Sequence, residues 1–260
     1  MSVSAQYLKL TMKNNPMKNI LTVLSFLFLS ATSFAQSPDY DDLRILFADA
    51  NYEKLVKVAS GYTEKDKTKK DPIPYLWCAK GLYQVSLSGT DNEKFKNAFK
   101  DAIKYLSKGM KYDLKYNEGS NLDDHKEFID KFQLSVFETI DNELNDGNYR
   151  KSFGITIKYQ KISLQTVGAK YLMGACKYLD QDKTSARTLW QEADVLLKAT
   201  ESLEGWSEAD VKMLKAGLLT SGMALKNSRQ GDKAKALLNK AAHWFEEDSE
   251  WQEKYDEIVH

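Results

Sequence analysis

The residues best placed in the sequence to do chemistry together are Asp123, Asp124 and His125. Two carboxylates and an imidazole are donors that a divalent metal ion accepts. The same residue types also suit the start of a helix, where acidic groups cap free N–H groups and complement the helix dipole. We expect the helix start, because the two other histidines, His243 and His260, are too distant in sequence to suggest a His-rich metal site.

The sequence contains none of the common motifs that indicate catalysis or cofactor binding. His-Glu-x-x-His, a phosphate-cradling Gly loop, Cys-x-x-Cys and Gly-x-Ser-x-Gly are all missing. We therefore expect no catalytic, cofactor-binding or metal-binding residues and no cofactor, and an enzyme is the least favoured class.

An acidic stretch near the last residues is accompanied by two tryptophans: Trp244, Glu246, Glu247, Asp248, Glu250 and Trp251. Such a stretch could recognise a basic partner. A solvated terminal helix is the simpler interpretation, because runs of like charge usually face water.

Residues 1–35 have the layout of a secretory signal peptide. An apolar run from Ile20 to Leu29 follows Lys13 and Lys18, and small residues precede Gln36. The run is shorter than the roughly 20 residues that span a bilayer, and no Cys follows it for lipid attachment. We expect cleavage after Ala35, with residues 36–260 as the mature domain in the periplasm or outside the cell, and Met17 as an alternative start.

The charge balance argues against nucleic-acid binding. The chain has 37 basic and 37 acidic residues, and acids interrupt nearly every Lys cluster. Proteins that bind nucleic acids usually carry a basic excess to neutralise phosphates. With 42% hydrophobic and 28% charged residues, the chain suits one extended soluble domain without membrane insertion after signal cleavage.

Hydrophobic periodicity predicts an all-α chain, because period 3.6 recurs and sustained period 2 does not. Residues 126–144 place their apolar side chains on one helical face. Ser207 with Asp210 predicts a capped helix start, and Pro72 with Pro74 suits another. Breaks are expected at the turn-forming clusters Asp91-Asn92, Asn117-Glu118-Gly119, Asp146-Gly147-Asn148, Asp180-Gln181-Asp182 and Gln230-Gly231-Asp232.

One spacing occurs twice along the chain. Gly174 is followed by Ala186, Trp190 and Ala193, and the same intervals separate Gly222, Ala234, Leu238 and Ala241. Small residues allow the two helices of a pair to cross closely, and the large residue between them fills the space toward the next pair.

These residues resemble the tetratricopeptide repeat family. The match is clearest over Met173–Ala193, and Ala102, Leu106 and Gly109 occupy the same three positions in residues 101–113. Residues 146–159 resemble the family's turn, and residues 51–55 begin another such helix. The resemblance implies a right-handed solenoid of antiparallel helix pairs with about four degenerate repeats.

The resemblance also implies a concave surface lined by the first helix of each pair, which binds extended peptides or partner helices. Six residues are expected near it: Tyr75, Leu82, Tyr171, Tyr178, Met223 and Lys226. Aromatic and Met side chains at helical spacing are more often core, so each assignment competes with burial.

The two cysteines, Cys78 and Cys176, both lie in apolar helical segments. We expect small buried residues without a disulfide, because first helices separated by an intervening pair hold their Cα atoms beyond bonding reach.

Together these features predict a non-catalytic interaction scaffold of the cell envelope that binds a protein or peptide partner. The alternative is a helical protein that binds a small ligand or a glycan, for which the 12% aromatic content is the motive.

Overall fold

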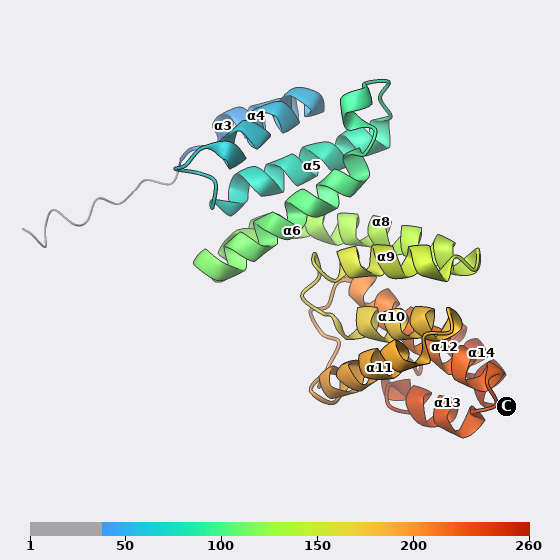
Figure 1. Ribbon diagram of the computed structural model, residues 1–260. Coiled ribbons are helices and arrows are strands. Elements are labelled where there is room, and N and C mark those ends of the chain that lie inside the picture. Colours follow the sequence, from blue (N-terminus) through green and yellow to red (C-terminus); the bar gives the residue numbers. More distant parts are fainter. Residues whose placement is uncertain (1–37) are drawn as a thin grey trace, which may run out of the picture. The chain divides into compact units, whose positions relative to one another are not determined.

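Every regular element in the described part of the chain, residues 38–260 of a computed structural model, is a helix (Figure 1). This confirms the all-α prediction for those residues. The predicted signal segment, residues 1–35, lies outside them. Within residues 38–260 we find no helix with both the length and the apolar character needed to cross a membrane.

Twelve α-helices and two short 3-10 helices follow one another between Asp41 and Val259. They are α3 (Asp41–Ala48), α4 (Tyr52–Glu64), α5 (Pro72–Ser88), η1 (Glu93–Phe95), α6 (Ala98–Tyr116), α7 (Ser120–Asp124), α8 (Lys126–Asn145), α9 (Tyr149–Tyr159), α10 (Val167–Leu179), α11 (Lys183–Lys198), α12 (Glu208–Asn227), α13 (Gly231–Leu238), η2 (Ala242–Trp244) and α14 (Ser249–Val259). Helix α8 confirms the helix predicted at residues 126–144.

Side-chain caps explain where four of the helices begin. Ser207 accepts a hydrogen bond from the backbone N–H of Asp210, as predicted for the start of α12. Helices α5, α11 and α14 begin in the same way: a backbone N–H group of the first turn donates to the side chain of Asp71, Asp182 and Asp248, respectively. Each cap satisfies one N–H group that has no partner within its helix, which contributes about 1 kcal/mol.

Four of the five predicted breaks lie between helices, and in the fifth only Gln230 does, because α13 already begins at Gly231. The turn between α8 and α9 shows the reason, because Gly147 has φ 73° there, a left-handed conformation that favours glycine. Gln181 and Arg229 adopt similar values in the turns after α10 and α12. Such residues reverse the chain within three positions, so that successive helices can pack side by side.

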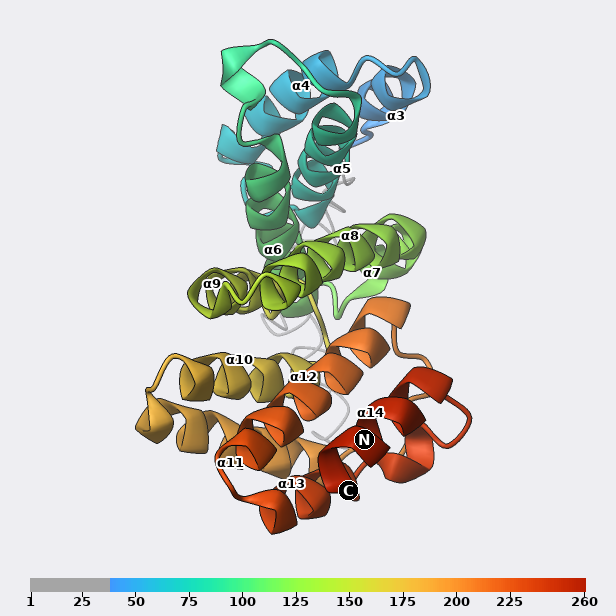
Figure 2. The same cartoon turned by 90° about the vertical axis from the view of Figure 1, so that its right-hand side faces the viewer.

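Residues Asp41–His260 form one compact unit in which neighbours in sequence are mostly neighbours in space. Helix α5 packs on α4 and α6, α9 on α8 and α10, and α13 on α12. Figure 2 shows α8 and α9 between α5–α6 and the group formed by α10 to α14. Helix α12 lies at the centre of that group: it contacts α10, α13 and α14, and it also contacts α8.

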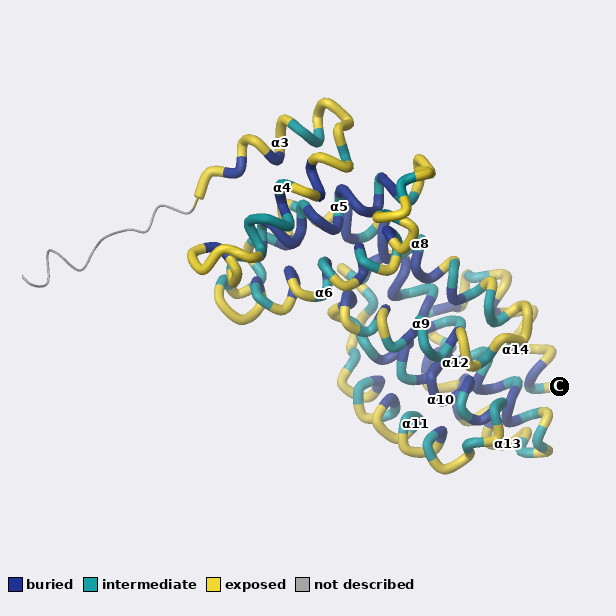
Figure 3. Tube along the Cα trace, turned by 45° about the horizontal axis from the view of Figure 1, so that its top comes forward, coloured by how far each residue is buried: buried dark blue, intermediate teal, exposed yellow. Residues whose placement is uncertain are grey.

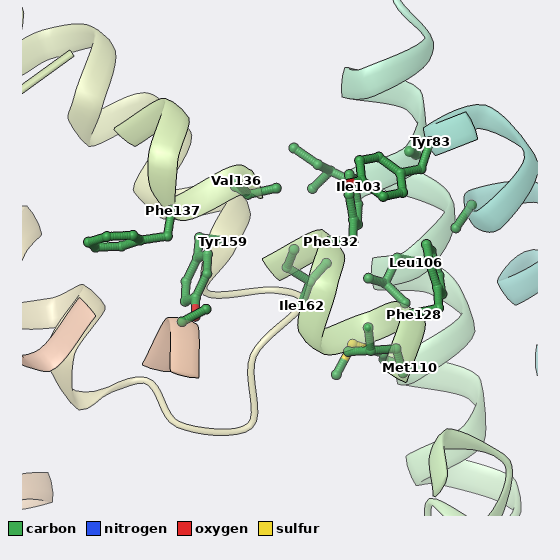
Figure 4. Close-up of a cluster of buried hydrophobic side chains, with 14 of the residues drawn as sticks. Tyr83, Ile103, Leu106, Met110, Phe128, Phe132, Val136, Phe137, Tyr159 and Ile162 are labelled. Carbon is green, nitrogen blue, oxygen red and sulfur yellow. The ribbon is translucent and has the colours of Figure 1, made fainter. Parts of the chain in front are cut away.

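The core consists of two main clusters of buried apolar side chains. The first extends from α4, α5 and α6 through α8 and α9 to α10 and the start of α12, and Figure 4 shows Phe128 and Phe132 of α8 facing Leu106 of α6. The second surrounds α12 and includes Trp251 of α14, which is fully buried. Burying such side chains is the main favourable contribution to folding.

Small residues lie where the helices of a pair meet. A Cβ atom added to Gly174 of α10 would come within 2.4 Å of Trp190 of α11, and one added to Gly222 of α12 would come within 3.2 Å of Leu238 of α13. The four alanines of the repeated spacing, Ala186, Ala193, Ala234 and Ala241, are fully buried. The same spacing therefore gives the same glycine contact in both pairs.

Helices α10 and α12 cross with their backbones in close contact, which the sequence alone does not predict. A Cβ atom on Gly168 would lie 2.4 Å from the backbone nitrogen of Leu214, and one on Gly217 would lie 2.5 Å from the carbonyl oxygen of Gly168. Only glycine leaves room for the two backbones at this crossing. Figure 3 shows that α10 is mostly buried, whereas α11 carries exposed residues along its length.

Both cysteines are buried and free, on α5 and α10 respectively. Burial raises the pKa of both thiols, that of Cys176 to about 11, so few thiolates are present at neutral pH.

We expect a thiol reagent to label almost nothing in the native protein and two thiols per chain after denaturation without reductant. A count of zero after denaturation would reveal a disulfide and contradict this arrangement of helices.

Candidate functional site

Four of the six residues predicted for a binding surface are buried in the core. Tyr75 and Leu82 of α5 are each 4% exposed, Tyr171 of α10 is fully buried, and Tyr178 is 6% exposed. These side chains offer little surface to a partner, and this corrects the expectation. The reason is that both helices are covered on more than one side, α5 by α4 and α6, and α10 by α9, α11 and α12.

The buried tyrosines make contacts within the chain. The hydroxyl of Tyr171 donates to Asp194 at 2.5 Å, and that of Tyr75 donates to the carbonyl oxygen of Lys69 at 2.8 Å. Burial is the main cause that raises the pKa of Tyr75 to about 12. The ring of Tyr178 stacks on Trp190, with 5.3 Å between the centroids.

The remaining two predicted residues, Met223 and Lys226, lie half-buried on α12 beside an open groove. Met223 lines the groove, which has a volume of about 500 Å³. Lys226 donates from Nζ to the carbonyl oxygen of Glu257 and so ties α12 to α14. Of the six predicted residues, only Met223 is part of the groove lining, and Lys226 lies three positions further along the same helix.

Helices α8, α12 and α14 supply most of the groove. The lining consists of Phe137, Asp141, Leu144, Asn145, Tyr149, Leu179, Lys212, Lys215, Ala216, Leu219, Thr220, Met223, Ala224, Asn227, Glu250, Lys254 and Ile258. In Figure 2, α12 runs below α8 with α14 beside it. Because α12 contacts both α8 and α14, the three helices bring these side chains together.

The groove has an apolar floor. Ala216, Leu219 and Met223 follow one another at intervals of three and four residues, so they share one face of α12. Phe137 and Leu144 add apolar surface from α8. Their spacing in α8 is also helical, but sequence alone could not distinguish them from core positions.

The basic groups of the groove are already paired with acids of the same chain. Lys215 donates to Asp248 at 2.9 Å and to Glu250 at 2.5 Å. Burial acts to lower the pKa of Lys215, but the bonds to Glu250 and Asp248 outweigh it and raise that pKa. Lys212 pairs with Glu208, and Lys254 pairs with Glu257. This pairing leaves little unbalanced positive charge to select an anionic ligand.

The acidic stretch near the last residues has a structural role in this arrangement. Asp248 caps α14 through the N–H group of Trp251 and also binds Lys215. Glu250 completes the ion-pair cluster. Asp248 and Glu250, two of the acidic residues that suggested a surface for a basic partner, therefore bind a lysine of the same chain.

Asp123, Asp124 and His125 lie at the junction of two helices. Asp123 and Asp124 end the short α7, and His125 precedes α8 without a side-chain capping bond. The expected cap is therefore absent from α8. Among residues 38–260, no group of three or more His, Cys, Asp and Glu side chains is arranged to hold a metal ion.

His125 packs edge-on against Trp77 of α5, with 5.7 Å between ring centroids. Burial, assisted by the charge of Lys80, lowers the pKa of His125 to about 4. The imidazole is therefore neutral near pH 7. Its buried Nδ1 has no hydrogen-bond partner among the described residues, so protonation is not stabilised there.

The lowered pKa of His125 makes folding stability depend on pH. An unfolded chain, with a His pKa near 6.5, takes up the proton first, so stability is lost as the pH falls from about 6.5 toward 4. Allowing for partial exposure of the ring, we expect a loss of about 1 to 2 kcal/mol between pH 7 and pH 5. Urea unfolding at both pH values measures it.

His125→Phe keeps a ring against Trp77 and removes the titrating group, so it should remove most of this loss. The depressed pKa values of Asp182 and Asp248 act at lower pH and should be unaffected. Equal losses in both proteins would exclude His125 as the cause.

Comparison with known proteins gives no relative: no family description, no characterised protein and no solved structure matches the chain.

Proposed function

We propose that this protein is a non-catalytic scaffold of the cell envelope that binds a segment of a partner protein in the groove along α12. The observation that carries the proposal is the apolar floor of that groove, open to solvent between α8 and α14. Exposed apolar surface of this kind is a common feature of protein-binding sites.

Two features of the groove favour an apolar peptide segment as the occupant. A volume of about 500 Å³ accommodates several side chains. The lysines of its lining are paired within the chain, which favours apolar over ionic contacts with the occupant. An amphipathic helix laid in a groove uses this mode of recognition.

A tetratricopeptide-like solenoid remains part of the proposal. The matched contacts of Gly174 with Trp190 and of Gly222 with Leu238 support it, because equivalent positions of two helix pairs pack alike. Export by the segment at residues 1–35 is also proposed, from its apolar run behind lysines, and implies a partner in the periplasm or outside the cell.

Selection of peptides from a random library on the purified protein tests the proposal. We expect the selected peptides to carry an apolar face and to bind saturably. Leu219→Lys places a charge in the groove floor and should weaken their binding about 10- to 100-fold, the effect of leaving a charge desolvated in an apolar contact.

Val195→Lys is the matched control, because Val195 is 68% exposed on α11 and is not part of the groove lining. It should leave the affinity unchanged, and both variants should melt near the parent. Peptides that bind the two variants equally well would place the binding surface elsewhere.

A further inference from the structure

A second cavity, of about 220 Å³, lies where α7 and α8 meet the start of α12. It is separate from the groove and shares no residue with it. Its lining consists of Met110, Leu122, Asp123, Lys126, Ile129, Asp130, Gln133, Leu164, Gln165, Gly205, Trp206, Ser207 and Asp210.

Two of its polar side chains are almost completely buried. Gln133 is 3% exposed and donates from Nε2 to the carbonyl oxygen of Ile162 at 2.5 Å. That bond fixes the orientation of the amide, because the reverse orientation would bring two oxygens together. The acceptor Oε1 is left without a hydrogen-bond partner among the described residues.

The second buried polar group is the carboxylate of Asp210, which is 4% exposed. It accepts hydrogen bonds from the hydroxyls of Tyr159 at 2.7 Å and Ser163 at 2.6 Å. Burial raises the pKa of Asp210, while these bonds act in the opposite direction. A positive charge nearby would favour its ionised form.

The other groups add negative charge and an aromatic wall. Asp123 and Asp130 bring the carboxylates of the lining to three, against the single ammonium of Lys126. Lys126 is already paired with Asp130 at 2.5 Å. Trp206 is half-buried beside them, and an indole ring attracts a cation more strongly than other aromatic side chains do.

We propose that this cavity binds the cationic group of an amine or a guanidine. The excess of carboxylates repels anions, and the unpartnered acceptor of Gln133 matches a ligand rich in N–H donors. The volume is below that of sites for drug-sized ligands, so it fits a group of side-chain size. Two sources share this chemistry: a free small amine, and a Lys or Arg side chain of a partner.

Calorimetric titration of the purified protein with n-butylamine and n-butylguanidine tests the proposal, with 1-butanol and butyrate as neutral and anionic counterparts. We expect saturable binding of the cations alone, weakened by added salt. Blocked arginine, N-acetylarginine methylamide, distinguishes the sources: affinity at least equal to that of butylguanidine indicates a side chain, and much weaker binding indicates a free amine.

Two variants should act with opposite sign. Asp130→Asn removes a carboxylate and leaves Lys126 unpaired, so cation affinity should fall about 10-fold, whereas Lys126→Met removes the competing ammonium and should raise it about 3-fold. Glu246→Gln, an exposed residue outside the lining, should change nothing.

Three results would overturn the proposal. The first is butanol or butyrate binding as well as the amines. The second is the absence of saturable cation binding up to millimolar concentration. The third is a loss of affinity in Lys126→Met equal to that in Asp130→Asn, since both would then act by disturbing the fold.

Discussion

Replacing Gly168 by alanine should destabilise the protein by about 3 kcal/mol or more, a large effect for the addition of one methyl group. The new Cβ would lie 2.4 Å from the backbone nitrogen of Leu214 and 2.6 Å from its Cα. No side-chain rotation relieves contact with a backbone, so α10 and α12 must separate, and the core around α12 loosens with them. Urea unfolding measures the loss directly.

Gly154→Ala provides the matched control. Gly154 also lies inside a helix, α9, but a Cβ atom there meets nothing within 4 Å. Alanine is the better helix former by roughly 0.5 to 1 kcal/mol, so this variant should be slightly more stable than the parent. If the two alanine variants proved equally stable, the close crossing of α10 and α12 would be wrong.

Trp190→Ala should cost about 3 to 5 kcal/mol, because it opens a cavity where α10, α11 and α12 meet. The ring of Trp190 stacks on Tyr178 and covers Gly174. Its Nε1 donates to Ser221 at 2.9 Å and to the carbonyl oxygen of Tyr171 at 3.2 Å. Thermal and urea unfolding should both show the loss.

Trp190→Phe separates packing from hydrogen bonding. It keeps an aromatic ring but removes the donor, so it should cost clearly less than the alanine variant, with about 1 kcal/mol of the loss due to the missing bonds. A Trp190→Ala protein as stable as the parent would contradict the packing of these three helices.

The local features of the fold could be predicted because their causes are local. Period 3.6 identifies α8, a Ser with an Asp three residues later marks the start of α12, and Gly147 lies in the turn after α8. The contact between Gly174 and Trp190 follows from residues only sixteen positions apart, within one helix pair.

The features that could not be predicted from the sequence depend on contacts between segments that are distant along the chain. Gly168 and Gly217 meet across 49 positions, and each alone resembles an ordinary helical glycine. Lys215 reaches Asp248 across 33 positions, which is why the acidic stretch resembled a surface for a partner.

The candidate site was predictable only in part, for a related reason. Periodicity places Tyr171 and Met223 on apolar helical faces, but it does not say how many neighbours cover each face. Helix α10 is enclosed by α9, α11 and α12, whereas the face of α12 that carries Met223 is left open. Tyr171 is therefore a core residue, and Met223 lines the groove.

The most direct test of partner binding along α12 is photo-crosslinking in the cells that make the protein. A benzophenone side chain replaces Met223 in the groove or, as a control, Val195 on the exposed face of α11. The proposed function predicts one discrete adduct from position 223, none from position 195, and loss of the adduct when Leu219→Lys is added. Equal adducts from both positions, or none from position 223, would contradict it.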